Sequence, residues 1–178
     1  MLLLLLAALF LGVASYGQVE EGESAEAPPV GQPPAIELVS AAGTQLAVAE
    51  SSCVTSTQDG QGVGVCGDTE DMKPRELSLV RPGEEIVIRL RDASVTEGTL
   101  EVRRLSCDIE TFTELKLEAG PETGWRVDIP PGQYELQVYA DFEAPDGASG
   151  DVSGSLGIFV ADDQSQKVIP VPDTFVGC

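Results

Sequence analysis

Residues that commonly carry catalysis are sparse in this chain. It contains no histidine, so it has neither an imidazole general base nor the parts of a Ser-His-Asp or Cys-His arrangement. Adjacent carboxylates occur at Glu84-Glu85 and Asp162-Asp163, and a glycosidase needs two such groups. Neighbouring residues on a strand point to opposite faces, so neither doublet would face one substrate. With no P-loop, GxSxG or dinucleotide-binding glycine pattern either, we expect a protein that is not an enzyme.

Carboxylates in glycine-containing loops indicate a second possible chemistry, calcium binding. Hard cations prefer oxygen ligands, and three loops have this composition: DGQG at Asp59, residues 68–71, and DGASGD from Asp146 to Asp151. None follows the EF-hand pattern, and Asp with Gly is also ordinary turn chemistry. The sequence therefore predicts no required cofactor. If calcium is bound, Asp146 and Asp151 are the ligands that we expect.

The cysteines predict disulfides rather than a metal or redox site. There are four of them, without a CxxC motif or any histidine, and an even number is typical of an exported domain with two disulfides. Cys53 with Cys66 is the local pairing, because the segment VTSTQDGQGVGV between them can reverse direction. Cys107 with Cys178 would then tie the C-terminal tail to the domain. The other two pairings remain open.

The first residues resemble a secretory signal. Leu2–Val13 is apolar apart from one glycine, small residues follow it, and the run is too short for a membrane-spanning helix. No basic residue precedes Lys73, so the usual basic n-region is missing. Residues 1–15 are predicted to be a signal peptide and 16–34 a disordered, acidic, Pro-rich tether. The expected location is secreted or extracytoplasmic, with no insertion of the mature domain into a membrane.

The charge of the chain restricts its partners. The net charge is −20; the segment before Ala35 carries four Glu and no basic residue, which leaves 26 acidic and 10 basic residues, or −16. Nucleic acids and anionic membrane surfaces attract Lys and Arg. The sequence therefore excludes nucleic-acid binding and favours an unidentified partner in the envelope or outside the cell.

Two units of the same kind organise the elements that would position these residues. In Leu77–Leu90 and in Trp125–Phe142, apolar and polar residues alternate on both sides of a proline-glycine break. Alternation with period two is typical of strands buried on one face. Proline cannot donate to a β-ladder, and glycine tolerates the turn. The units predict antiparallel β architecture.

Shorter alternating segments complete the predicted fold. They give eight to ten strands without a helical period, which indicates an all-β, antiparallel, immunoglobulin-like β-sandwich over residues 35–161, with a closed barrel as the alternative and 162–178 as the tail. Asp92–Gly98 is predicted to be a polar connection. The additional strand segments are Ile36–Val39, Gln45–Ala49, Thr99–Leu105, Leu115–Leu117 and Val152–Val160.

The aromatic residues provide candidates for binding. Trp125, the only tryptophan, is predicted in or beside the core. Tyr139 and Phe142 are expected on or near an outward-facing set, and Phe159 lies opposite Ile158 along its strand. An exposed aromatic on a sheet face could bind a glycan or a protein, although single exposed aromatics need no explanation.

The order of motifs is similar to one family. GTQLAVAESSC followed by GVCxD, then LxLxRPGEEIxIRL, PPGxYxLxVYADF and GDxSGSxGIxV resembles uncharacterised exported bacterial domains with an N-terminal cysteine pair, over Ala41–Val160. The resemblance implies an immunoglobulin-like sandwich and an exported location, and no activity. We therefore expect a non-catalytic interaction or structural module. A calcium-stabilised adhesion or matrix module is the alternative, and a carboxylate hydrolase the third class.

Overall fold

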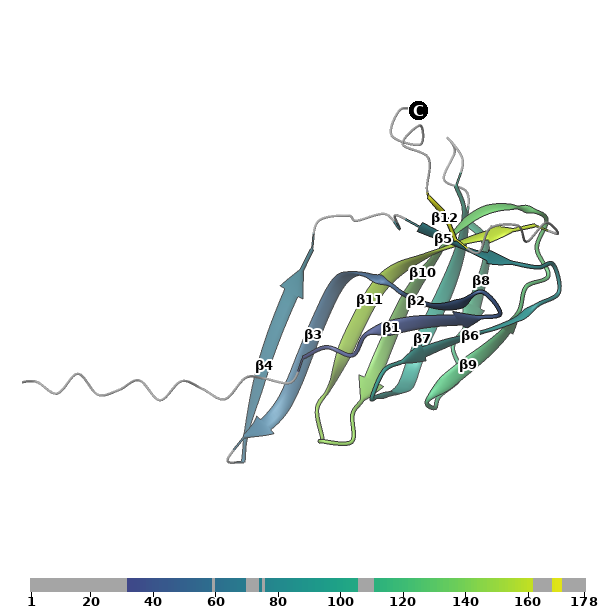
Figure 1. Ribbon diagram of the computed structural model, residues 1–178. Coiled ribbons are helices and arrows are strands. Elements are labelled where there is room, and N and C mark those ends of the chain that lie inside the picture. Colours follow the sequence, from purple (N-terminus) through teal and green to yellow (C-terminus); the bar gives the residue numbers. More distant parts are fainter. Residues whose placement is uncertain are drawn as a thin grey trace, which may run out of the picture.

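The chain folds into two β-sheets packed face to face, as a computed structural model shows (Figure 1). The structure describes residues 32–58, 60–69, 74, 76–105, 111–161 and 168–170. In this part of the chain, no helix is long and apolar enough to cross a membrane. The predicted all-β sandwich is thereby confirmed. The strands are β1 (Ile36–Ser40), β2 (Gly43–Leu46), β3 (Val48–Gln58), β4 (Gln61–Asp68), β5 (Glu76–Val80), β6 (Glu85–Leu90), β7 (Ser94–Arg104), β8 (Thr111–Lys116), β9 (Glu122–Arg126), β10 (Gly132–Glu143), β11 (Ser149–Val160) and β12 (Val168–Pro170).

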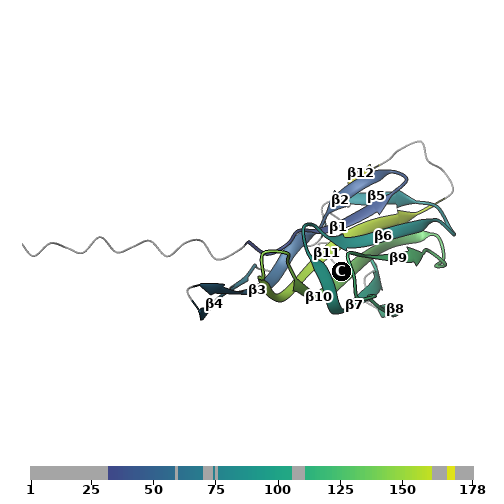
Figure 2. The same cartoon turned by 90° about the horizontal axis from the view of Figure 1, so that it is seen from below.

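The two sheets differ in size. The smaller sheet has the order β2-β1-β6-β9, with every pair antiparallel. The larger sheet has the order β12-β5-β11-β10-β7-β8, and the β3–β4 hairpin joins it through β11. One edge of β11 is shared: its first half pairs antiparallel with β3, and its end pairs in parallel with β5. The smaller sheet covers the central strands, while β3 and β4 extend past it (Figures 1 and 2).

Both proline-glycine breaks are corners where the chain changes sheets. Residues 81–84 lead from β5 in the larger sheet to β6 in the smaller one, and residues 127–131 lead from β9 back to β10. The corners are hydrogen-bonded to each other: Gly83 N–H donates to the Val127 carbonyl and Val127 N–H to the Glu84 carbonyl, both at 2.9 Å. Gly83 has φ 75°, a conformation that glycine adopts without strain. The two proline-glycine corners therefore bring the sheets face to face.

The core lies between the sheets and follows the alternation of the sequence. On β10 the even-numbered residues from Tyr134 to Phe142 are buried there, opposite Val152, Leu156 and other apolar residues of β11. Trp125 packs against this core and is partly buried, as predicted. The Tyr134 hydroxyl donates to the Pro130 carbonyl at 2.8 Å. This bond ties the start of β10 to the corner before it.

Three expectations about single segments are wrong. Asp92–Gly98 is not a polar connection, because β7 begins at Ser94 and buries Val95, which bridges to Gly120. Gln45–Ala49 is not one strand, since the chain leaves β2 after Leu46 and enters the other sheet with β3 at Val48.

Phe142 does not face outward either. It belongs to the inward set of β10 and is 2% exposed. A register shift between Asp141 and Phe142 in the pairing with β7 does not change its side.

Candidate functional site

The best-organised surface is the outer face of the larger sheet, opposite the core. Its rows follow from the registers of β7, β10 and β11. Thr99, Tyr139 and Ser153 form one row; Glu101, Gln137 and Ser155 form the next. Part of this face is covered: Pro74 and the fully buried Leu77 lie against Gly157 of β11. Several polar side chains of the face, among them Gln137, Ser153 and Ser155, are also buried.

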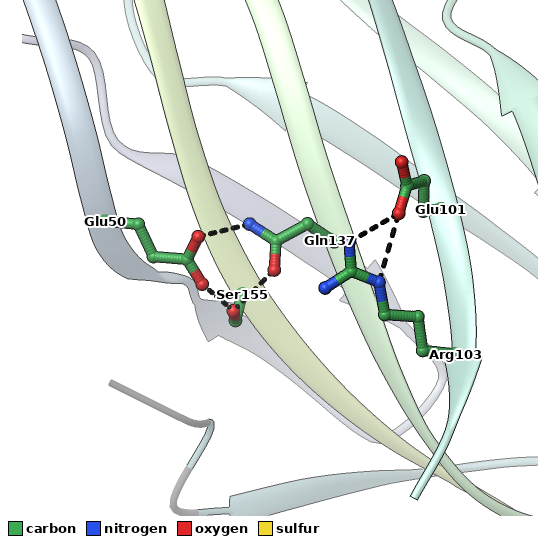
Figure 3. Close-up of polar contacts among 5 residues, drawn as sticks. All are labelled: Glu50, Glu101, Arg103, Gln137 and Ser155. Atoms are coloured by element: carbon green, nitrogen blue, oxygen red, sulfur yellow. Dashed lines mark hydrogen bonds and ion pairs between the residues drawn. The ribbon is translucent and has the colours of Figure 1, made fainter. Parts of the chain in front are cut away.

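A buried polar network, Glu50–Gln137–Ser155, crosses three strands (Figure 3). Gln137 and Ser155 are 2% and 1% exposed. The Glu50 carboxylate accepts hydrogen bonds from the Gln137 amide and from the Ser155 hydroxyl, and the Ser155 Oγ lies 3.0 Å from the Gln137 Oε1. Buried polar groups are costly unless they are bonded. The network therefore fixes its three side chains in one arrangement.

A β-bulge delivers Glu50 to this network. On β11, Ser153 and Gly154 are consecutive, but their partners on β3 are Ser51 and Ala49, so Glu50 is the extra residue. A bulge bends the strand and re-aims a side chain. The Glu50 carbonyl also accepts bonds from the Thr69 N–H at 2.6 Å and hydroxyl at 2.9 Å. Simple alternation does not reveal such a residue, and sequence reasoning missed it.

The ion pair Glu101–Arg103 lies beside this network (Figure 3). Glu101 stands opposite Gln137, one row from Tyr139. The Arg103 Nε and Nη2 donate to the Glu101 Oε2 at 3.0 and 2.5 Å. Partial burial acts to lower the pKa of the Arg103 guanidinium, but the hydrogen bond and charge of Glu101, with a bond to Tyr139, raise it overall. Arg103 thus stays charged, and Tyr139 nearby is 40% exposed.

A shallow hollow of about 210 Å³ adjoins Tyr139. Glu97, Asp141 and Asp151 stand directly opposite one another along its acidic side. The Ser51 and Ser153 hydroxyls, 2.8 Å apart, lie on its floor. The hollow offers one aromatic ring, hydroxyls and hydrogen-bond acceptors. This composition suits a polar partner with donor groups.

The two predicted calcium ligands have different positions. Asp151 lies in β11, opposite Asp141. Asp146 lies in the β10–β11 turn, where its Oδ1 accepts the Ala148 N–H at 3.0 Å. Among the described residues, no three His, Cys, Asp or Glu side chains are placed to hold a metal ion. Asp59 and residues 70–71 of the other acidic loops lie outside the described residues, and calcium binding stays a prediction.

Cys53 and Cys66 form the predicted local disulfide, across the β3–β4 hairpin. The resemblance implies an N-terminal cysteine pair, and this expectation is wrong, because the disulfide joins the third and fourth strands of the sandwich. Cys107 and Cys178 lie outside the described residues, as does Asp162-Asp163. Within the predicted tail, β12 pairs antiparallel with β5.

A second ionic cluster lies on the outer face of the smaller sheet. Glu37 is 3% exposed and accepts the Arg89 Nε at 2.8 Å and the Arg91 Nε at 2.7 Å. These bonds hold the pKa of the Glu37 carboxyl below its ordinary value, although burial opposes them. Both arginines are about half exposed. All three groups are satisfied by one another, which indicates a stabilising cluster.

No protein-family model matches the chain, and no curated protein is similar to it in sequence. The described part of the chain is a disulfide-containing β-sandwich whose larger sheet carries an ordered polar network on its outer face. Of the predicted binding residues, Tyr139 lies on this face. Phe159 is partly buried there, at the pairing with β5.

Proposed function

We propose that this chain is a non-catalytic interaction module of the cell envelope or the extracellular space, which binds its partner through the outer face of the larger sheet around Tyr139. The supporting observation is the ordered polar face itself. Gln137 and Ser155 are fixed by their hydrogen bonds with Glu50, and the exposed Tyr139 lies in the adjacent row of the same face. Fixed side chains lose less entropy when a partner binds.

Two features support the exported, immunoglobulin-like part of the proposal. Disulfides such as Cys53–Cys66 persist mainly in oxidising compartments. Tyr134 bonds back to Pro130 at the corner that leads into β10, as the tyrosine corner does in immunoglobulin-like sandwiches. We therefore include in the proposal the exported, immunoglobulin-like domain that the resemblance implies, with its cysteine pair placed in the β3–β4 hairpin.

A calcium-stabilised adhesion or matrix module is the second candidate. The observation that favours it is the row Glu97–Asp141–Asp151, which concentrates carboxylates across three strands. Like charges directly opposite one another destabilise a sheet. A bound cation would relieve that repulsion, and its test is the calcium melting experiment described in the Discussion.

Site-directed photocrosslinking tests the interaction proposal. A photoreactive residue replaces Tyr139 in the full chain, expressed in the cells that make it, and replaces Leu46 in a control. Leu46 is also exposed but lies on β2, in the smaller sheet. We expect a discrete adduct from position 139 in the envelope or extracellular fraction and none from position 46. Equal adducts from both positions, or none from position 139, would contradict the proposal.

A further inference from the structure

Within the described part of the chain, β4 is a free edge strand that projects from the sandwich. Of the described strands only β3 pairs with it, and the β3–β4 hairpin extends beyond the smaller sheet (Figures 1 and 2). Almost every residue of β4 is exposed, and Val65 is 55% exposed. A free edge presents unpaired N–H and C=O groups to solvent and is a template for another strand.

The pairing with β3 shows which backbone groups of β4 point outward. Thr69 N–H donates to the Glu50 carbonyl, and the β3–β4 register runs without a shift from there. In an antiparallel ladder, bonded and non-bonded pairs alternate. Cys53 and Cys66, with Cα atoms 4.0 Å apart, are a close, non-bonded pair by this count. The outward N–H and C=O groups therefore belong to Gly62, Gly64, Cys66 and Asp68.

This edge lacks the devices that usually prevent strand addition. Proteins protect free edges with Lys, Pro, bulges or inward charges. Between Ser51 and Gly67 the chain has no proline, no basic residue and a single charge, at Asp59, whereas 22% of the whole chain is charged. Two copies, each with a net charge of −20, repel one another. The hairpin is the surface where that repulsion is weakest.

No contact among the described residues requires the glycines of β4. Gly62 and Gly67 would accept a Cβ with nothing within 4 Å, and at Gly64 the nearest atom would lie at an ordinary 3.5 Å. None of the three has a positive φ. Glycine weakens a strand and often marks a place where another backbone approaches closely. Three such residues in one edge strand leave these positions without side chains that could obstruct a partner strand.

We propose that β4 pairs with β4 of a second copy of this chain, antiparallel about a two-fold axis, so that the two larger sheets become continuous. A two-fold contact uses the same patch on both copies, and in an antiparallel pair the outward N–H and C=O groups of one β4 meet those of the other. From Gln61 to Gly67 β4 carries no charge, and Asp68 at its end is its one charged residue. Antiparallel pairing also keeps the two Asp68 carboxylates apart, whereas parallel pairing would place them together. The inference concerns a different surface from Tyr139 and does not depend on the proposed partner.

The test measures the oligomeric state of the oxidised full chain by sedimentation equilibrium. A contact of one short strand is smaller than a standard interface, so we expect a monomer–dimer equilibrium with a dissociation constant between about 10 µM and about 1 mM. Raising NaCl from about 0.1 M to about 1 M should tighten the dimer, because salt screens repulsion between the copies. A contact made by ion pairs would weaken instead.

Matched variants at one position identify the strand. Gly64→Pro removes an outward N–H but none of the bonds to β3, and we expect it to weaken the dimer at least about tenfold. Gly64→Ala keeps the N–H and should stay within about threefold of the wild type, since the added Cβ makes only ordinary contact. Peptide mapping without reduction, to find Cys53 joined to Cys66 in both variants, shows that the hairpin has formed.

Three results would overturn the inference. They are a wild-type chain that is monomeric up to about 1 mM, a dimer that weakens with salt, and a Gly64→Pro variant that dimerises as well as Gly64→Ala. A partner protein captured on β4 while the chain itself remains monomeric would also contradict self-pairing. None of these outcomes changes the result expected for photocrosslinking at position 139, so either proposal can be rejected without rejecting the other.

Discussion

Tyr134 couples the core to the corner between the sheets. Its ring is fully buried, it meets Phe112 edge-on with centroids 6.0 Å apart, and its hydroxyl bonds to the Pro130 carbonyl. Tyr134→Phe keeps the ring but removes the bond. We expect the free energy of unfolding, measured with urea, to fall by about 1–2 kcal/mol. Tyr139→Phe on the exposed face is the control and should change it by less than about 0.5 kcal/mol.

The same residue predicts a dependence on alkaline pH. Burial raises the pKa of the Tyr134 phenol above its ordinary value, and the charge of Arg104 opposes this only in part. Above about pH 10 an unfolded tyrosine loses its proton while the folded one keeps it, so folding stability falls as the pH rises. The wild type should lose stability faster than Tyr134→Phe between about pH 9.5 and about pH 11. Parallel curves would show that Tyr134 does not contribute.

The Glu37 carboxyl predicts a loss of folding stability at acidic rather than alkaline pH. Because its bonds to Arg89 and Arg91 lower the carboxyl pKa, it stabilises the fold above the ordinary carboxyl pKa. That contribution disappears as the pH falls through the lower, folded value. Glu37→Gln should cost about 1–2 kcal/mol at neutral pH, a moderate value because the arginines are half exposed.

Urea unfolding at several pH values measures this difference. It should shrink below about pH 4, where the unfolded carboxyl is protonated. The exposed Glu143→Gln is the control, with little expected change at any pH. A Glu37→Gln cost that is the same at neutral and acid pH would contradict the ionic explanation.

The elements were largely predictable because alternation and strand breaks are local properties. Leu77–Leu90 contains β6 and most of β5 on the two sides of its break. In Trp125–Phe142 the strand after the break is β10, but before the break only Trp125 and Arg126 belong to a strand, β9, and residues 127–131 form the corner. What the sequence did not show is that each break changes sheets, since that depends on the distant contact between Gly83 and Val127. Glu50 was missed for a related reason: a bulge exists only relative to the partner strand.

Two glycines of the larger sheet differ in whether the surrounding structure leaves room for a side chain. A Cβ on Gly150 would lie 1.8 Å from the Cys53 carbonyl oxygen, in the pairing of β11 with β3. Gly150→Ala must push these backbones apart and should cost about 3 kcal/mol or more. Gly62→Ala meets nothing within 4 Å and should stabilise β4 by up to about 1 kcal/mol.

Chemical denaturation of the two glycine variants measures both changes. Both remove one glycine from the larger sheet, so a general effect of lost flexibility would move them in the same direction. Opposite signs are the expected result. A Gly150→Ala variant as stable as the wild type would show that β3 can move away from β11 without cost.

The whole molecule combines a fixed polar sheet face with a large negative charge. The part from Ala35 onward carries −16, so any salt should stabilise it by screening self-repulsion. Screening acts alike for calcium and magnesium, whereas a real site distinguishes them by size and coordination. Thermal melting of the oxidised full chain in each cation, and in EDTA with NaCl, therefore separates the two effects when ionic strength is matched.

We expect calcium and magnesium to raise the melting temperature equally. Asp146 is already bonded within its turn, and the described residues offer no three-ligand cluster. A real site at about a hundred times its dissociation constant would add ~2.7 kcal/mol, a shift of several degrees for a domain of this size. A shift of that size with calcium alone would favour the adhesion candidate. If Asp151→Asn then abolished the calcium-specific shift and the exposed control Asp128→Asn did not, the ion would lie at the acidic row. There, relief of the repulsion between Asp141 and Asp151 would add to the binding free energy.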